Sequence, residues 1–81
     1  MTKVLLFGRL RDVAGWRETE VTPAPAMLSD LRRRIDQAWP ELARALAGPG
    51  IQTAVNRALV RGDIALAPGA EVAFMPPMSG G

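Results

Sequence analysis

The sequence predicts an α+β fold in which one main helix packs across a mixed sheet of four or five strands. Short apolar runs near both ends of the chain, residues 3–10 and 71–75, show the two-residue alternation of strands. Between them, residues 27–38 repeat their apolar side chains at helical spacing. Clusters of proline and glycine separate these segments. With 81 residues, of which 48% are hydrophobic, the chain makes one domain with a single core.

The first predicted strand, residues 3–10, carries apolar side chains on both faces. Val4 and Leu6 point to one side of the sheet, and Leu5 and Phe7 point to the other. One face is expected to meet the helix and form the core. The other must contact something else, which makes it a candidate binding surface.

The helix predicted over residues 27–38 has its apolar side chains on one side and its charges on the other. No Ser, Thr, Asp or Asn stands directly before Met27, so the amino-terminal cap is expected to be poor, costing the helix about 1 kcal/mol. Trp39–Pro40 ends the helix, because a residue before proline avoids helical angles. Residues 41–46 are predicted as one further short helical piece. Arg32 to Arg34 are interpreted as a solvated helix face.

The remaining segments are shorter. The chain order is predicted as strand, strand, helix, strand, short strand, strand, with turns at residues 56–57 and 67–70. The shorter pieces are a loop or short helical turn over residues 11–16, and strands over residues 18–22, 51–56, 58–60 and 71–75.

The composition excludes the common kinds of active site. There is no Cys and no His, hence no disulfide, no thiolate nucleophile and no zinc ribbon, and the commonest general base is missing. The net charge is only +2, and neither Trp16 nor Trp39 sits in an array suited to base stacking, so no nucleic-acid partner is expected. No apolar run is long enough for a membrane span and no signal peptide is expected, so a cytoplasmic location is predicted.

The end of the chain is its least ordinary part. Residues 1–77 are expected to fold as the domain, while residues 78–81 form a flexible tail that extends roughly 13 Å beyond it. Pro76–Pro77 stiffens the base of this arm. Gly80 and Gly81 can thread a narrow channel and present the terminal carboxylate. A carboxylate becomes reactive once adenylation supplies a leaving group, and sulfide would then convert it to a thiocarboxylate. A terminal Gly-Gly without any role is the alternative.

The terminal segment Glu-Val-Ala-Phe-Met-Pro-Pro-Met-Ser-Gly-Gly, residues 71–81, resembles the carboxy-terminal signature of the MoaD family, the small subunits of molybdopterin synthase. The resemblance runs the whole chain. Two further stretches share it: Ala54-Val55-Asn56 with Leu59-Val60, and Lys3-Val4-Leu5-Leu6-Phe7 with Arg11 and Gly15.

This resemblance implies a β-grasp (ubiquitin-like) fold and a reaction cycle. A MoeB-like adenylating enzyme, related to ubiquitin activators, would charge Gly81 with ATP and magnesium, and a sulfur donor would convert it to a thiocarboxylate. The tail would then enter the large, MoaE-like subunit and supply sulfur for the dithiolene of molybdopterin, made from cyclic pyranopterin monophosphate. The chain would be a subunit and co-substrate, with no cofactor or metal of its own. A heterotetramer is expected, although the sequence leaves the stoichiometry open.

The residues expected to act fall into two groups. Gly81, with Gly80, is the reactive end. The partner-binding residues lie on the strand faces opposite the core, beside Leu5, and along the base of the tail, with Arg11 at the rim; they are Phe7, Leu59, Met75, Pro76, Pro77, Met78, Ser79 and Arg11. Coverage of this apolar patch by the chain's own loops is the alternative.

Three other functions fit parts of the sequence. A sulfur carrier of the thiazole pathway (ThiS) would use the same tail chemistry. A ubiquitin-like protein modifier would join Gly81 to lysines of target proteins. A plain binding module would have an accidental Gly-Gly, and deletion of Gly80 and Gly81 would leave its function intact.

Overall fold

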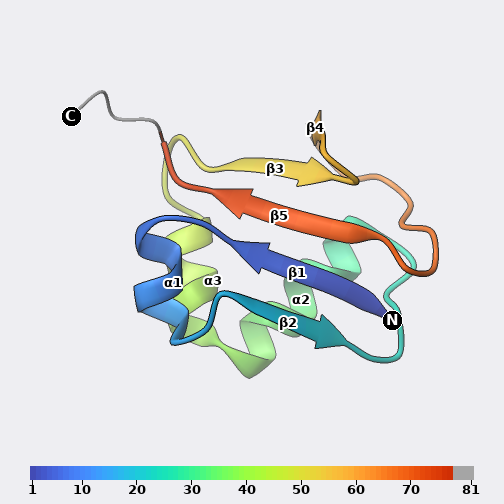
Figure 1. The fold of residues 1–81 in the computed structure, drawn as a ribbon, viewed down its shortest axis with the longest axis horizontal. Helices are drawn as coiled ribbons and strands as arrows, with labels where there is room; N and C mark the ends of the chain where they lie inside the picture. The colour runs from blue at the N-terminus through green and yellow to red at the C-terminus, as the bar shows by residue number, and fades with distance from the viewer. Residues whose placement is uncertain (78–81) are drawn as a thin grey trace.

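The computed structural model describes residues 1–77, which form a five-stranded mixed sheet and three helices (Figure 1). The strand order is β2-β1-β5-β3-β4; β1 and β5 run parallel, and the other neighbouring pairs are antiparallel. The strands are β1 (Thr2–Leu6), β2 (Glu18–Val21), β3 (Gln52–Val55), β4 (Ala58–Val60) and β5 (Glu71–Met75). The helices are α1 (Arg9–Ala14), α2 (Leu28–Ala38) and α3 (Pro40–Leu46). The predicted α+β architecture is confirmed.

The core lies between the sheet and α2. Val4 and Leu6 of β1, and Val72 and Phe74 of β5, are each at most 1% exposed. The apolar side of α2 packs against them, with three fully buried side chains: Leu28, Leu31 and Ile35. The alternation predicted for the first and last strands is therefore confirmed, because the buried residues fall on every second position.

The prediction of a first strand reaching residue 10 is wrong. β1 ends at Leu6, and a short helix, α1, begins at Arg9. Gly8 adopts a positive φ of 57°, which turns the chain out of the sheet. Leu10 is consequently a helical residue, and its side chain is fully buried in the core.

The short helical piece predicted after Trp39 is confirmed as α3. Its first residue is Pro40, a position where the missing N–H costs nothing and the fixed φ suits the helix. Leu42 and Leu46, four residues apart, are both buried. α1 and α3 lie beside each other at the end of the sheet where β1 and β5 finish (Figure 1).

Both predicted turns are also confirmed. Asn56 and Arg57 have positive φ angles of 50° and 72°, as the two central residues of a tight hairpin require, and they join β3 to β4. In the second turn the N–H of Ala70 donates to the carbonyl oxygen of Ala67 at 3.1 Å, and Gly69 has φ 82°. Both features are those of a type II turn.

The amino terminus of α2 is better capped than the sequence suggests. Met27 stands at the N-cap position and supplies no side-chain hydrogen bond, as predicted. However, Asp63, far along the chain, accepts hydrogen bonds from the N–H and the hydroxyl of Ser29, both at 2.8 Å. The carbonyl oxygen of Ile64 accepts from the N–H of Leu28 at 2.9 Å. The loop between β4 and β5 thus supplies the missing cap. The prediction that the helix loses about 1 kcal/mol for want of a cap is therefore wrong.

The interpretation of Arg32 to Arg34 as a solvated face is confirmed for Arg32 and Arg33, which are exposed, while Arg34 is partly buried. Arg32 nevertheless makes two contacts with the sheet. Its guanidinium lies 5.4 Å from the ring centroid of Phe74 and donates to the hydroxyl oxygen of Thr53 at 3.0 Å. Arg33 pairs with Asp30 one turn earlier on the exposed side of α2. Arg32 therefore ties the helix to β3 and β5, while its neighbour remains a surface ion pair.

Candidate functional site

The sheet face opposite α2 carries a continuous apolar row across four strands. The strand registers place Leu5 beside Ala73, Ala73 beside Ala54, and Ala54 beside Leu59. Because neighbours in register point to the same side of a sheet, these four side chains share the outer face. No helix of residues 1–77 lies over this face, which is turned toward the viewer in Figure 1.

The predicted apolar patch is present on this face. Phe7 is 40% exposed and Leu59 is 65% exposed, while Leu5 and Met75 are partly buried. Together with the two alanines of the row they border a shallow hollow of about 440 Å³. Its lining is Leu5, Phe7, Ala54, Arg57, Leu59, Glu71, Ala73 and Met75. Phe7 and Leu59 are not covered by the described loops, so the alternative that the chain covers its own patch fails for these two residues.

Charged side chains border the patch. Arg57 and Glu71 line the hollow itself. On the β2 side, Lys3 lies 3.8 Å from the carboxylate of Glu18, which stands in register with Leu5. The outer face therefore has an apolar row from β1 to β4 with charged side chains of β1, β2 and β5 beside it, an arrangement typical of a binding surface with a polar rim.

Arg11, the predicted rim residue, packs against the ring of Phe7. Its guanidinium carbon lies 5.6 Å from the ring centroid of Phe7, and its Nε donates to the carbonyl oxygen of Leu6 at 3.0 Å. One of its five N–H groups is thus used within the chain, and the others are available for contacts with a partner. The structure brings Arg11 and Phe7 together, as the predicted surface requires.

The base of the tail adjoins the patch. Met75 is the last residue of β5 and pairs with Gln52 of β3. Pro76 is partly buried and Pro77 is exposed. Neither proline has an N–H, so the ladder of strand hydrogen bonds ends here, as predicted. The predicted site residues Met78, Ser79, Gly80 and Gly81 lie outside the described residues.

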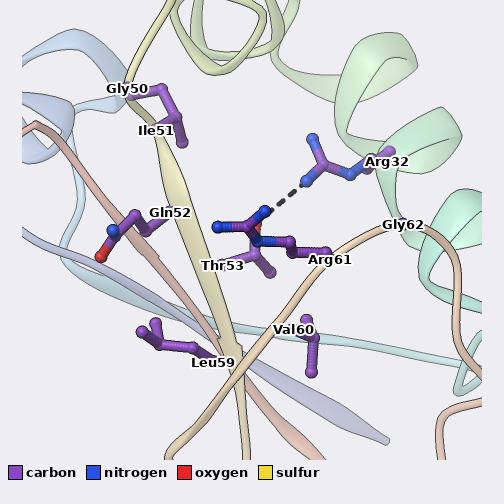
Figure 2. A pocket seen from close by; sticks show the side chains of 9 residues that line it. All are labelled: Arg32, Gly50, Ile51, Gln52, Thr53, Leu59, Val60, Arg61 and Gly62. Carbon is purple, nitrogen blue, oxygen red and sulfur yellow. Dashed lines mark hydrogen bonds between the residues drawn. The ribbon is translucent and has the colours of Figure 1, made fainter.

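A second and larger hollow lies along β3, β4 and the residues that follow β4 (Figure 2). It has a volume of about 670 Å³. Its nine lining residues are Arg32, Gly50, Ile51, Gln52, Thr53, Leu59, Val60, Arg61 and Gly62. They include two guanidinium groups and no carboxylate, and the Thr53 hydroxyl accepts the hydrogen bond from Arg32. The lining side chains include neither a carboxylate nor an imidazole that could act as a general base.

Residues 1–77 contain no group of three or more His, Cys, Asp or Glu side chains that could hold a metal ion. In the same part of the chain, no helix has the length and apolar character needed to cross a bilayer.

The predicted partner-binding residues leave out four residues that shape this region. Ala54 and Ala73 form the floor of the apolar hollow, and the two-residue alternation of their strands could have placed them there. Gly8 and Gly50 lie against the prolines at the base of the tail. No local pattern reveals these two, because each belongs to a loop distant in sequence from its proline.

Comparison with known proteins agrees with the geometry. The ThiS family model matches residues 4–81. The molybdopterin synthase sulfur carrier subunits of Escherichia coli (strain K12) and Haemophilus influenzae are 38% and 30% identical to this chain, each over 100% of both chains. The crystal structure of SAMP1 from Haloferax volcanii matches with a TM-score of 0.85 and 30% identity, covering 99% of this chain and 98% of that one. The predicted β-grasp (ubiquitin-like) fold is thereby confirmed. The chain belongs to the ThiS family, and its full-length similarity to two molybdopterin synthase sulfur carrier subunits confirms the resemblance to the MoaD family that its terminal segment predicts.

Proposed function

We propose that this chain carries sulfur on the carboxylate of Gly81 and donates it, as the small subunit of molybdopterin synthase, to the dithiolene of molybdopterin. The observation that carries this proposal is the 38% identity, over the full length of both chains, to a protein named as a molybdopterin synthase sulfur carrier subunit. The substrate that receives the sulfur would be cyclic pyranopterin monophosphate.

The proposed chemistry takes place at the terminal acyl group. A carboxylate oxygen of Gly81 attacks the α-phosphorus of ATP, pyrophosphate leaves, and an acyl-adenylate forms. Hydrosulfide supplied by the donor then attacks the acyl carbon, AMP leaves, and loss of a proton gives the thiocarboxylate. ATP and magnesium would be bound by a MoeB-like activating enzyme rather than by this chain. The absence of Cys and His from the sequence supports this division, since catalytic groups would come from the partners.

The outer face would dock the partners. Phe7 and Leu59 project apolar surface, and Met75 joins the hollow directly to Pro76 at the base of the tail. A large, MoaE-like subunit that covers the hollow would therefore also receive the tail. Exposed apolar patches with polar rims commonly mark such interfaces. The structure supports this role through the position of the patch, next to the segment that leads to Gly81.

Intact-mass measurement tests the proposed chemistry. The chain is incubated with ATP, magnesium, a candidate activating enzyme and sulfide. The expected result is a mass gain equal to the exchange of one oxygen atom for one sulfur atom. A chain extended by one residue beyond Gly81 is the matched control and should gain nothing, because its terminal carboxylate is displaced from the active site. An unchanged mass with an enzyme shown to be active would contradict the proposal.

Protein modification is a second candidate, favoured by the similarity to SAMP1, the small archaeal modifier protein 1 of Haloferax volcanii. The acyl-adenylate would form in the same way, and a lysine amine of a target protein would then displace AMP. A tagged chain would yield high-mass conjugates in a cell lysate, and a variant lacking Gly80 and Gly81 would yield none. A thiazole-pathway carrier would be distinguished by restoring thiazole synthesis, and not molybdopterin synthesis, in a deficient strain.

A further inference from the structure

Two glycines from separate loops hold the two prolines at the base of the tail. Gly8 lies between β1 and α1, and a Cβ placed on it would come within 2.8 Å of Cγ of Pro76. Gly50 lies between α3 and β3, and a Cβ placed on it would come within 2.7 Å of Cβ of Pro77. Both distances fall well below the 3.4 Å at which ordinary van der Waals contact begins. Each proline is thus accommodated only because the facing residue has no side chain.

Close packing at this point replaces hydrogen bonding. Just past the end of β1, the N–H of Phe7 donates to the carbonyl oxygen of Phe74 in β5, at 3.3 Å. Beyond Met75 the two prolines have no N–H to donate to a neighbouring strand. Contact with Gly8 and Gly50 therefore fixes the prolines at the point where the hydrogen-bonded ladder can no longer do so.

We propose that Gly8 and Gly50 are positioning residues that seat Pro76 and Pro77 and thereby set the direction in which the chain leaves the domain after Pro77. The inference rests on the proposed function, because direction matters only if Gly81 must reach a reacting group in a partner. A terminal carboxylate displaced by about 1 Å can lose on the order of a hundredfold in the rate of adenylation, since its attacking oxygen and the α-phosphorus must lie in line and in contact.

The Gly50→Ala variant tests the proposal. Its Cβ would lie about 0.7 Å inside the limit of ordinary contact with Pro77. Pro77 is exposed, so the clash is relieved by movement of the arm rather than by unfolding of the domain. The expected result, in ATP–pyrophosphate exchange with the activating enzyme, is a kcat lower by roughly ten- to a hundredfold. KM for this chain should be unchanged, because the outer face is intact.

Gly69→Ala is the matched control. Gly69 has a φ of 82°, close to the 79° of Gly50, but apart from Gly69 and its two chain neighbours no residue has an atom within 4 Å of the position its Cβ would take. Alanine at either position therefore suffers similar backbone strain, and only alanine at position 50 meets a proline. Equal kcat values for the two variants would overturn the proposal.

A second substitution tests whether the loss of kcat in Gly50→Ala arises from the clash with Pro77 or from a wider disturbance of the fold. Pro77→Gly removes the ring atoms that the new Cβ would strike. In that background, Gly50→Ala should lower kcat no further than Gly69→Ala does, which is the coupling expected of residues in direct contact. An additional loss specific to Gly50→Ala would show that Gly50 acts through something other than Pro77.

Nuclear Overhauser contacts in the unmodified protein test the seating without any enzyme. Cross-peaks are expected between Gly8 and Pro76 and between Gly50 and Pro77, and the absence of either pair would refute that half of the proposal. If the unmodified chain supports no exchange with an active enzyme, the proposed function fails, and these cross-peaks alone decide whether the prolines are seated as described. If the unmodified chain is active and the Gly50→Ala and Gly69→Ala variants have equal kcat values, the inference about the glycines is refuted but the proposed function stands.

Discussion

The two faces of the same sheet have different roles, although their residues alternate along the same strands. On the face toward α2, Val72 and Phe74 of β5 are fully buried, whereas Ala73 and Met75, which alternate with them, point outward and border the apolar hollow. Both faces are apolar, yet only the inner one has a partner within residues 1–77. A strand can therefore contribute to folding and to binding at once, and substitutions on its two faces should separate stability from affinity.

The largest effect is expected on the inner face. Phe74→Ala removes a fully buried ring that also lies against Arg32, and should lower the free energy of unfolding by about 3–5 kcal/mol. A domain of this length has only about 4–12 kcal/mol in total, so the variant would be close to unfolding. Urea denaturation followed by the fluorescence of Trp16 and Trp39 measures the change. A loss below about 1 kcal/mol would contradict the assignment of Phe74 to the core.

The next effect is expected on the outer face, in affinity rather than stability. Phe7→Ala should weaken binding to the large subunit by about 2 kcal/mol, roughly thirtyfold in Kd. It should lower the free energy of unfolding by less than this, because the ring is 40% exposed. Isothermal titration calorimetry and urea denaturation provide the two values.

Val13→Ala is the control for Phe7→Ala. Val13 is 38% exposed and lies on α1, outside the hollow. Its truncation should change neither quantity appreciably. Unchanged affinity in Phe7→Ala would remove Phe7 from the docking surface.

A smaller effect is expected from the residue that supports Phe7. Arg11→Ala removes the guanidinium that lies over the ring and should cost about 0.5–1 kcal/mol of affinity for the same partner. If Arg11 acts through Phe7, the double variant with Phe7→Ala should bind no more weakly than Phe7→Ala alone. Additive losses would instead indicate that Arg11 contacts the partner directly.

The comparison of faces also shows how far the sequence could predict this protein. The outward position of Leu5 and Met75 follows from a two-residue alternation that is local, and it is confirmed. A short helical turn was one of the two structures predicted for residues 11–16, but the start of α1 at Arg9 was missed, because Leu10 is buried by packing in the folded chain, which no local pattern specifies. The seating of Pro77 against Gly50 was missed for the same reason, since it joins segments far apart in sequence. Periodicity predicts which side chains share a face of a strand or helix. Which residues pack against that face depends on tertiary contacts between segments distant in sequence.

The smallest effect is expected at the helix that covers the inner face. Hydrogen bonds from the hydroxyl and the N–H of Ser29 lower the pKa of Asp63 below its ordinary value of 3.8. Because the pKa is lower in the folded chain, the ionised carboxylate stabilises the fold above about pH 4, and this stabilisation is lost as the pH falls through the lowered value. Asp63→Asn should therefore melt at a slightly lower temperature than the unmodified chain at pH 7, with the difference shrinking below pH 4. A difference in melting temperature that stayed constant or grew in acid would show that the carboxylate charge at Asp63 does not stabilise the amino terminus of α2. The stability of this helix would then come from its packing against the inner face of the sheet rather than from its cap.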